Sequence, residues 1–209
     1  MQKIKVVEIF DSIEGEGRLI GYPVSFIRLE GCNLRCSWCD TPYSYDTENY
    51  KLMSIEEILN TIKDFSNKKV CITGGEPLVN EGFDPLFEAL IKENYYVILE
   101  TNGTVYREII GKLYPEYSEN IYVVCSPKPD SNYMVHIDLK PYISEMKLVV
   151  DEFLTENIVS AFVDFPITLQ PEGNKQEFFR KALKIQKSLI KKGIEVRIIP
   201  QIHKFFKVD

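Results

Sequence analysis

Three cysteines, Cys32, Cys36 and Cys39, fall within eight residues of one another in a Cys-x3-Cys-x2-Cys pattern. Clustered thiolates are soft ligands that favour zinc or an iron–sulfur cluster. Structural zinc usually takes four protein ligands, commonly as two spaced pairs, and no obvious fourth ligand lies near these three. Three thiolates on a 4Fe-4S cluster leave one iron open to a ligand that is not protein, so the pattern favours such a cluster. A zinc site completed by His136 or His203, or thiols without a metal, are the alternatives.

The other two cysteines, Cys71 and Cys125, lie in strand-like apolar runs. We expect both to be small buried hydrophobic residues. An odd total of five cysteines, three of them clustered, is not the pattern of a secreted disulfide scaffold. It favours a metal site in a reducing compartment, and we therefore expect a cytoplasmic protein.

Length and composition are those of a globular protein. The 209 residues predict a single domain over residues 1–209, and 44% hydrophobic with 27% charged residues exclude disorder and collagen. Lys and Arg number 25 against 31 Asp and Glu, a net charge of −6 that argues against nucleic acid or an anionic membrane as partner. Apolar runs are far shorter than the ~20 residues that span a bilayer, and early charged residues argue against a signal peptide.

Short β-branched and aromatic runs alternate with amphipathic stretches, which is typical of βα units and a parallel sheet. The predicted strands are Val24–Leu29, Val70–Thr73, Tyr96–Glu100, Ile121–Cys125, Met146–Val150, Ile167–Gln170 and Glu195–Ile199.

Three helices are predicted from their end signals. Ser54 and Glu57 form a capping box before one amphipathic run, and Asp84 is the expected N-cap of a second helix, with Pro85 in its first turn. A third helix is expected from about Lys175 to Lys192.

Five predicted strands in succession end in polar or Gly/Pro loops. These loops are Glu30-Gly31-Cys32, Gly74-Gly75-Glu76-Pro77, Thr101-Asn102-Gly103, Ser126-Pro127-Lys128 and Pro171-Glu172-Gly173-Asn174. In parallel α/β folds the ligand site lies outside the carboxyl ends of the strands, so these loops should converge on one site. We therefore expect a βα barrel, or part of one, with one functional rim.

The cysteine pattern after the first strand resembles that of the radical S-adenosylmethionine (SAM) enzymes, in which SAM binds the open iron. The Gly74-Gly75-Glu76-Pro77 loop resembles the glycine-rich element of the same superfamily. Within it, the chain resembles the 7-carboxy-7-deazaguanine synthase family over nearly its whole length. The motifs that carry the resemblance are Glu14-Gly15-Glu16-Gly17, Arg28, Cys39-Asp40-Thr41, Thr73 to Pro77, Glu100 to Gly103, Ser126-Pro127-Lys128, Gln170-Pro171 and His203-Lys204.

The resemblance implies an α/β fold: a partial (incomplete) βα barrel of about six parallel strands with helices outside and short N-terminal and C-terminal extensions. It also implies a 4Fe-4S cluster, SAM and Mg²⁺. In the implied reaction, an electron passed through the cluster cleaves SAM to methionine and a 5′-deoxyadenosyl radical. Hydrogen abstraction from C6 of 6-carboxy-5,6,7,8-tetrahydropterin, ring contraction and loss of ammonia then yield 7-carboxy-7-deazaguanine, in queuosine or 7-deazapurine biosynthesis. A reduced flavodoxin-type electron donor and a homodimer are further expectations.

Residue roles follow from the matched motifs. Cys32, Cys36 and Cys39 are expected to hold the cluster, and Thr41 to bind Mg²⁺ together with the substrate carboxylate. The residues expected to bind SAM are Gly75, Glu76, Ser126, Pro127, Lys128, Gln170, Pro171, Glu172 and Gly173. Those expected to bind the substrate are Ile13, Glu14, Gly15, Glu16, Arg28, Thr73, His203 and Asp209.

A carboxylated pterin needs a cation for its carboxylate and acceptors for its guanidine-like edge, which Arg28 and Glu16 would supply. Glu14 stands where the family commonly has Gln. Asp209 stands where relatives often end in Pro. The resemblance therefore implies a substrate contact for its terminal carboxylate and none for its side chain. A hydrophobic strap or dimer contact through Phe205 and Phe206 is the competing interpretation of the C-terminal segment.

Two other functions are compatible with the cysteine motif. One is a glycyl-radical-enzyme activase, which shares the motif and the small size but acts on a protein. The other is a non-catalytic zinc-binding module, which would hold zinc and no iron.

Overall fold

The computed structural model describes residues 3–45 and 48–206. Their strands form a nine-stranded sheet in the order β3-β1-β2-β4-β5-β6-β7-β8-β9. The strands are β1 (Ile4–Ile13), β2 (Pro23–Leu29), β3 (Lys51–Met53), β4 (Lys69–Gly74), β5 (Tyr96–Thr101), β6 (Ile121–Cys125), β7 (Ile143–Val150), β8 (Ile167–Pro171) and β9 (Arg197–Ile198). The helices are α1 (Ile55–Phe65), α2 (Phe83–Lys92), α3 (Glu108–Tyr117), α4 (Glu156–Ser160), α5 (Gln176–Ile190) and α6 (Ile202–Phe206).

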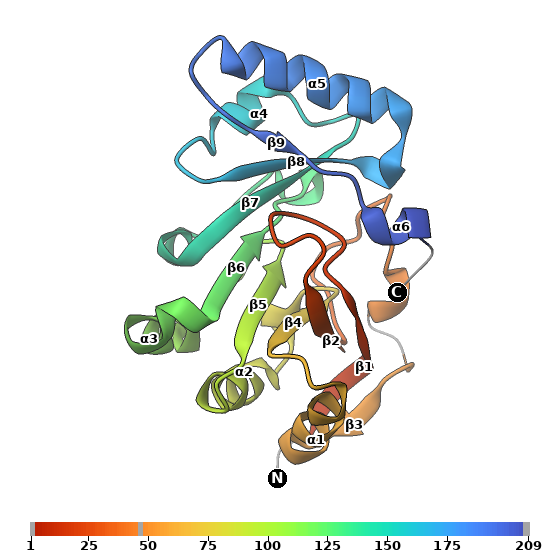
Figure 1. Ribbon diagram of the computed structural model, residues 1–209, viewed down its shortest axis with the longest axis vertical. Helices are drawn as coiled ribbons and strands as arrows, with labels where there is room; N and C mark the ends of the chain where they lie inside the picture. The colour runs from red at the N-terminus through yellow and green to blue at the C-terminus, as the bar shows by residue number, and fades with distance from the viewer. Residues whose placement is uncertain (1–2, 46–47, 207–209) are drawn as a thin grey trace.

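From β2 to β9 every neighbouring pair of strands is parallel, whereas β1 pairs antiparallel with β2 and β3 antiparallel with β1. The sheet curves but does not close, because its edges are β3 and β9 (Figure 1). The expected partial barrel is thus confirmed. The antiparallel edge places β1 beside the first parallel strand, so both strands contribute side chains to the same rim.

The predicted strands are found with small differences at their ends. The expected strand Glu195–Ile199 is reduced to the two residues of β9. The ten-residue β1 was missed because its alternation of buried residues is interrupted: Ile4 and Val6 face the core, and a register shift between Val6 and Glu8 then changes the pattern. A bulge of this kind re-aims the side chains that follow it.

The capping box of Ser54 and Glu57 begins α1 as predicted. The expected N-cap at Asp84 is wrong: Gly82 is the N-cap of α2, and Asp84 lies in its first turn, where its carboxylate is 3.8 Å from Arg107. The third predicted helix is found as α5. Helix α3 was missed, since Gly111 and Pro115 weaken its helical pattern.

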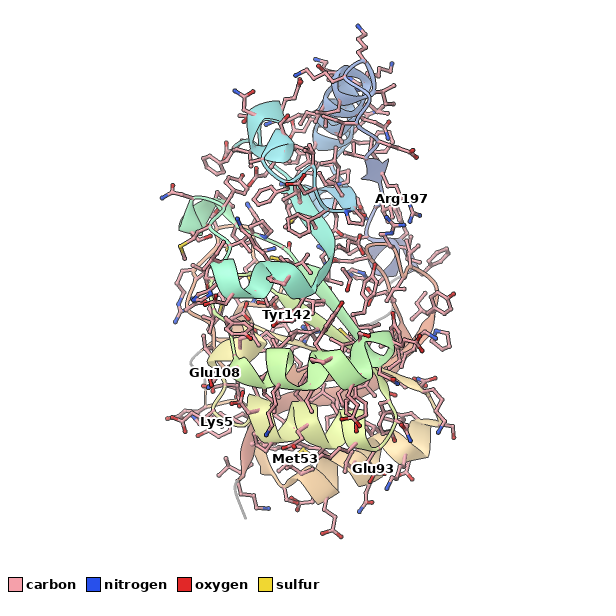
Figure 2. All side chains as sticks on the ribbon, turned by 90° about the vertical axis from the view of Figure 1, so that its left-hand side faces the viewer. Lys5, Met53, Glu93, Glu108, Tyr142 and Arg197 are labelled. Atoms are coloured by element: carbon pink, nitrogen blue, oxygen red, sulfur yellow. The ribbon has the colours of Figure 1, made fainter. Side chains whose placement is uncertain are left out.

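Helices cover the outer face of the sheet. In Figure 2, α1, α2 and α3 lie one above another on that face, and α5 packs against β7, β8 and β9 farther along. Their apolar stripes enclose two buried clusters, one under α1 to α3 and one under α4 and α5. Cys71 and Cys125 are fully buried, as predicted. Within the described residues, no helix is both long and apolar enough to cross a membrane.

Candidate active site

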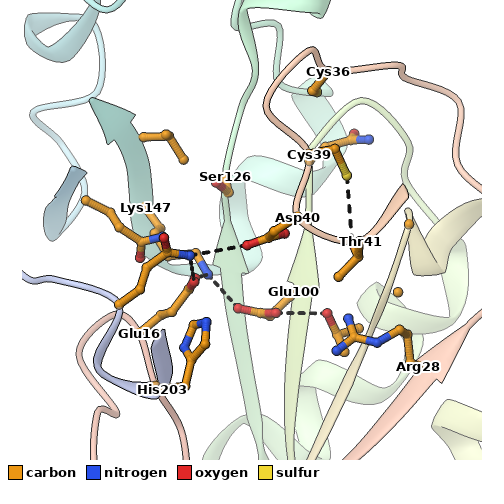
Figure 3. A pocket seen from close by; sticks show the side chains of 18 of the residues that line it. Glu16, Arg28, Cys36, Cys39, Asp40, Thr41, Glu100, Ser126, Lys147 and His203 are labelled. Atoms are coloured by element: carbon orange, nitrogen blue, oxygen red, sulfur yellow. Dashed lines mark hydrogen bonds and ion pairs between the residues drawn. The ribbon is translucent and has the colours of Figure 1, made fainter. Parts of the chain in front are cut away.

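A cavity of about 430 Å³ lies at the carboxyl ends of the parallel strands. Its volume is within the range of small-molecule sites. The expected site residues that line it are Ile13, Glu14, Gly15, Glu16, Arg28, Cys32, Cys36, Cys39, Thr41, Thr73, Gly75, Ser126, Lys128, Gln170, Glu172, Gly173 and His203. Loops spread over the sequence therefore converge on one site, as the parallel topology predicts (Figure 3).

Three expected residues, Glu76, Pro127 and Pro171, do not line this cavity. Asp209 lies outside the described residues. The fully buried carboxylate of Glu76 accepts hydrogen bonds from Thr101 Oγ1 at 2.7 Å and from the backbone of Asn102 at 2.6 Å. Burial raises its pKa to about 7. The Glu76 carboxylate thus holds the loop after β5 in place, beneath the cavity wall.

Cys32, Cys36 and Cys39 are free thiols on the loop that follows β2. In the described part of the chain, the His, Cys, Asp and Glu side chains whose ligand atoms gather within 4.8 Å are Glu16, Asp40 and His203, and the cysteines form no such group. The three thiols therefore lack the close spacing of a single-ion zinc site, although they share one cavity. This arrangement fits a larger cluster held at three corners.

The two histidines proposed as a fourth zinc ligand are engaged elsewhere. His136 accepts a hydrogen bond from the Asp138 backbone at Nδ1 and stacks on Tyr106. His203 belongs to the group with Glu16 and Asp40. The zinc site completed by a histidine is thus not formed by the described residues.

The cysteine loop is supported from below and from the side. Gly75 lies directly under it, and a Cβ there would collide with the carbonyl of Gly31 and the side chain of Cys32. Trp38 Nε1 donates to Asp151 Oδ2 at 2.9 Å, which ties the loop to the end of β7. Burial raises the pKa of the Cys36 thiol to about 12. Metal binding at this thiol must therefore displace its proton.

A buried charge network crosses the floor of the cavity. Lys147 on β7 has a side chain only 7% exposed, and its Nζ donates to Glu16 and, at 2.6 Å, to Glu100 Oε1. Glu100 Oε2 accepts from Thr73 Oγ1 at 2.9 Å. Burial opposes the charge on Lys147, but Glu100 and Glu16 outweigh it and raise its pKa. Both carboxylates are therefore held in fixed positions facing the cavity (Figure 3).

The same network sets the protonation of its acids. Burial raises the pKa of Glu16, but Lys147 outweighs this and lowers it to about 2. Glu14 is buried too, and burial together with the charge of Glu100 raises its pKa to about 8. Glu14 Oε1 accepts from the Glu16 backbone at 3.1 Å. At neutral pH Glu14 is therefore protonated, whereas Glu16 is ionised.

Arg28 lies away from Glu16, with Glu100 between them in Figure 3. Its Nε donates to Glu8 Oε1 at 2.7 Å, and its guanidinium carbon lies 5.8 Å from the ring centre of Tyr43. Thr41 lies near this end, with Oγ1 3.7 Å from Cys39 Sγ. The cavity thus has a guanidinium near one end and carboxylates on its floor, an arrangement suited to a ligand with an anionic group and a donor-rich edge.

Around the expected SAM-binding residues, Lys128 Nζ donates to Ser126 Oγ at 2.7 Å and lies 5.3 Å from the Trp38 ring centre. Burial and the charge of Lys147 lower the pKa of Lys128. Gln170 is buried at the cavity wall, and its Oε1 has no hydrogen-bond donor among the described residues. A buried acceptor without a partner is costly, so this oxygen fits a site that a ligand completes.

The C-terminal segment closes the side of the cavity next to Glu16. Gln201 Nε2 donates to Glu16 Oε1 at 2.6 Å, and Gln201 exchanges two hydrogen bonds with Asn174 through its backbone. Lys204 forms an ion pair with Asp40 at 3.2 Å. Through Lys204, therefore, this segment is part of the cavity wall.

Phe205 and Phe206 follow in α6 and are 63% and 71% exposed. The described part of the same chain therefore does not bury these two side chains. A strap that packs them against the body of the same chain is not formed.

The lining residues missed as functional candidates include Asp40, Glu100, Lys147 and Gln201. Lys147 carried a usable signal, because a lysine inside an apolar buried strand is rare unless it is paired. Asp40 and Glu100 lay within motifs already singled out. Gln201 had no sequence signal, since its role depends on where the C-terminal segment packs.

A family model described as "Radical SAM superfamily" matches residues 26–122. The 7-carboxy-7-deazaguanine synthase of Aquifex aeolicus (strain VF5) is 42% identical, covering 97% of this chain and 93% of that protein. The chain belongs to the 7-carboxy-7-deazaguanine synthase family.

Two other members agree with this assignment. The 7-carboxy-7-deazaguanine synthase of Rickettsia prowazekii (strain Madrid E) is 33% identical, covering 99% of this chain and 89% of that protein. The crystal structure of QueE from Escherichia coli superposes with a TM-score of 0.74 at 25% identity, covering 95% of this chain and 94% of that one. As a 7-carboxy-7-deazaguanine synthase family member, the chain is a radical SAM enzyme that uses SAM and a 4Fe-4S cluster.

Proposed function

We propose that this enzyme converts 6-carboxy-5,6,7,8-tetrahydropterin to 7-carboxy-7-deazaguanine with loss of ammonia, in queuosine or 7-deazapurine biosynthesis. The observation that carries the proposal is the cavity that joins three free thiols to a guanidinium at Arg28 and to carboxylates at Glu16 and Glu100. Its family membership supports the same reaction. When bound, the cluster and SAM together supply a radical able to remove a hydrogen atom from a carbon of the substrate.

The protein's part in this reaction is to bind and orient the substrate and SAM and to exclude side reactions. Arg28 would bind the substrate carboxylate, and the ionised Glu16 with Glu100 would accept hydrogen bonds from the guanidine-like edge. Lys147 keeps these two carboxylates in place, so the edge meets acceptors that are already oriented. Thr73, His203 and the backbone of residues 13–15 would complete the substrate contacts.

Cys32, Cys36 and Cys39 would hold the cluster. Gly75, Ser126, Lys128 and the loop of residues 170–173 would bind SAM, with the unpartnered Oε1 of Gln170 available to a donor of the ligand. Glu76, Pro127 and Pro171 do not line the cavity, so they would support the SAM site by holding its lining loops in place.

Thr41 would bind Mg²⁺ together with the substrate carboxylate and water. Its support is the position of its hydroxyl at the cavity wall, close to Cys39 and near Arg28. A hard cation that takes few protein oxygens and completes its shell from substrate and water is usual for Mg²⁺.

Four further expectations are part of this proposal. The carboxylate of Asp209 would accept from the substrate, a reduced flavodoxin-type protein would deliver the electron, the enzyme would work as a homodimer, and it would reside in the cytoplasm. The course of the C-terminal segment along the cavity as far as Lys204 supports the first of them.

The deciding experiment is anaerobic reconstitution of the chain with iron and sulfide, followed by SAM, a reductant and the carboxylated tetrahydropterin. We expect 7-carboxy-7-deazaguanine and ammonia, with none formed by Cys32→Ala. A tetrahydropterin without the carboxylate is the matched control and should not be converted. Activation of a glycyl-radical enzyme by this chain in place of pterin conversion would contradict the proposal. Zinc without iron in the purified protein would also contradict it.

A further inference from the structure

Glu145 is a fully buried carboxylate on β7, two residues before Lys147 and on the same inward face of the strand. It lies outside the wall of the large cavity. Its Oε2 accepts from the Arg18 backbone at 2.9 Å and from the Tyr122 hydroxyl at 3.2 Å, and its Oε1 accepts from the Thr168 hydroxyl. These three donors come from the β1–β2 connection, β6 and β8, so one side chain joins three parts of the barrel.

The connection between β1 and β2, residues 14–22, folds back on itself and enters the open barrel. Its ends are joined by hydrogen bonds from the Glu14 backbone to Tyr22 and from the Gly21 backbone to Glu14. Gly17, at a φ of +60°, lies directly on the Glu145 carboxylate, and a Cβ there would be 3.1 Å from Oε2. The backbone of this loop is therefore seated on Glu145.

The loop meets β7 at two points. Glu145 receives the backbone of Arg18, and Lys147 binds the side chain of Glu16. The space left between the loop and strands β5 to β7 is about 10 Å³, close to the minimum for one water molecule. Little water can therefore lie between the loop and Glu145.

A buried carboxylate is costly, and all three hydrogen-bond donors described for Glu145 are neutral groups. An apolar side chain of the same volume would leave the Arg18 amide and the Tyr122 and Thr168 hydroxyls without this acceptor. An apolar side chain therefore cannot fix the position of the Arg18 amide. The position of Glu16, two residues earlier in the same loop, depends on that contact.

We propose that Glu145 is a positioning residue for substrate recognition: it seats the loop of residues 14–18 so that Glu16 meets Lys147 and faces the cavity. The proposal rests on the substrate role given to Glu16 under the proposed function. It assigns no direct ligand contact to Glu145, which acts through the Arg18 amide.

The test compares Glu145→Ala and Glu145→Gln with Tyr122→Phe. The alanine variant removes the acceptor of the Arg18 amide, whereas the glutamine variant keeps an oxygen that can accept it. Tyr122→Phe removes a hydrogen bond to the same carboxylate but leaves the loop contact, so it is the matched control. Each variant is assayed for the KM of the carboxylated tetrahydropterin, the Kd of SAM and the melting temperature.

We expect Glu145→Ala to raise the substrate KM about tenfold, the equivalent of one hydrogen bond to a charged group. The Kd of SAM should change by less than about twofold. Glu145→Gln should return the substrate KM close to that of the parent chain. Tyr122→Phe should lower the melting temperature without changing the KM. Glu145→Leu, which keeps the packing volume, replaces the alanine variant if that one is recovered unfolded.

Hydrogen exchange gives a readout that does not depend on the proposed substrate. The amides of residues 14–19 should exchange faster in Glu145→Ala than in the parent chain, while those of α1 are unchanged. If the pterin is not the substrate, the exchange result still decides whether Glu145 seats the loop. Unchanged loop exchange, or an equal rise of KM in Tyr122→Phe, would show that Glu145 serves general stability alone and would overturn the proposal.

Discussion

The ammonium nitrogen of Lys147 lies 2.6 Å from Oε1 of Glu100, although β6 separates their two strands in the sheet. The contact therefore reaches across β6 on the inner face of the sheet. Lys147 also binds Glu16, which comes from the connection between β1 and β2. One cation thereby orients two carboxylates that reach the cavity from different directions.

Replacing Lys147 with Met should remove the ion pairs that orient Glu16 and Glu100, while nearly keeping the side-chain volume. The variant leaves Glu16 and Glu100 without their cation, and breaking a buried pair in this way typically costs about 3–5 kcal/mol. We expect a loss of that size in the free energy of unfolding measured by urea at pH 7, with part of it recovered at pH 5, where the acids can be protonated. Lys140→Met, at an exposed lysine, is the control. A stability equal to that of the parent chain would contradict the network.

Glu14→Gln should change the pH dependence of stability. The unfolded Glu14 carboxyl loses its proton near its ordinary value of 4.5, whereas in the folded chain it keeps it to about 8. The native state therefore binds more protons across this window, so stability falls as pH rises from about 4.5 to 8. The variant should lack this loss of stability. Its free energy of unfolding should therefore rise relative to that of the parent chain by up to about 1.4 kcal/mol per pH unit in this window. Urea unfolding at pH 6 and pH 8 measures it.

The exposed Glu56→Gln on α1 is the matched control for this pH experiment. Its stability should follow that of the parent chain at every pH. If Glu14→Gln did the same, Glu14 would be ionised in the folded protein at neutral pH.

Alanine at Cys32, Cys36 or Cys39 should abolish cluster binding with little change in melting temperature, because these thiols lie on a rim loop and the core is formed elsewhere. Cys71→Ala, in the barrel interior, should retain iron although it loses stability. Iron and sulfide analysis after reconstitution, with the visible absorption of the cluster, measures both. A rim variant with full iron and SAM cleavage would disprove the ligand assignment.

Arg28→Ala should weaken substrate binding far more than SAM binding. Truncating one partner of a buried charged hydrogen bond costs about 2–5 kcal/mol, or roughly 30-fold to several-thousand-fold in affinity. Calorimetric titration of each ligand separates the two effects. Because Glu8 pairs with Arg28 at 2.7 Å, Glu8→Gln should weaken substrate binding less while releasing the guanidinium. Equal loss of both ligands in Arg28→Ala would indicate a folding defect instead.

Thr41→Ala should lower turnover and its stimulation by Mg²⁺ without loss of iron, because only the hydroxyl near Cys39 is removed. Thr41→Ser keeps a hydroxyl and should restore the stimulation. Turnover measured against Mg²⁺ concentration, with iron content as the control, gives the comparison. Unchanged Mg²⁺ dependence in the alanine variant would exclude Thr41 as a ligand.

Local signals were enough to predict much of this protein. The spacing of Cys32, Cys36 and Cys39, the capping box at Ser54 and the apolar runs of the parallel strands depend on neighbours close in sequence, which is why their patterns could be interpreted directly. The convergence of the rim loops also followed from the sequence, because parallel strands end on the same side.

The tertiary structure alone decided which polar groups meet. The hydrogen bonds of Glu145 with the Arg18 backbone amide, of Lys147 with Glu100 and of Gln201 with Glu16 join residues from 47 to 185 positions apart. No spacing rule predicts such contacts, since they depend on the curvature of the sheet and on the loop and the C-terminal segment that pack into its opening. Burial then fixes their protonation, so that Glu14 and Glu16, two residues apart, have pKa values of about 8 and about 2. The same type of side chain is ionised at Glu16, which binds Lys147 directly, and protonated at Glu14, where burial and the charge of Glu100 dominate.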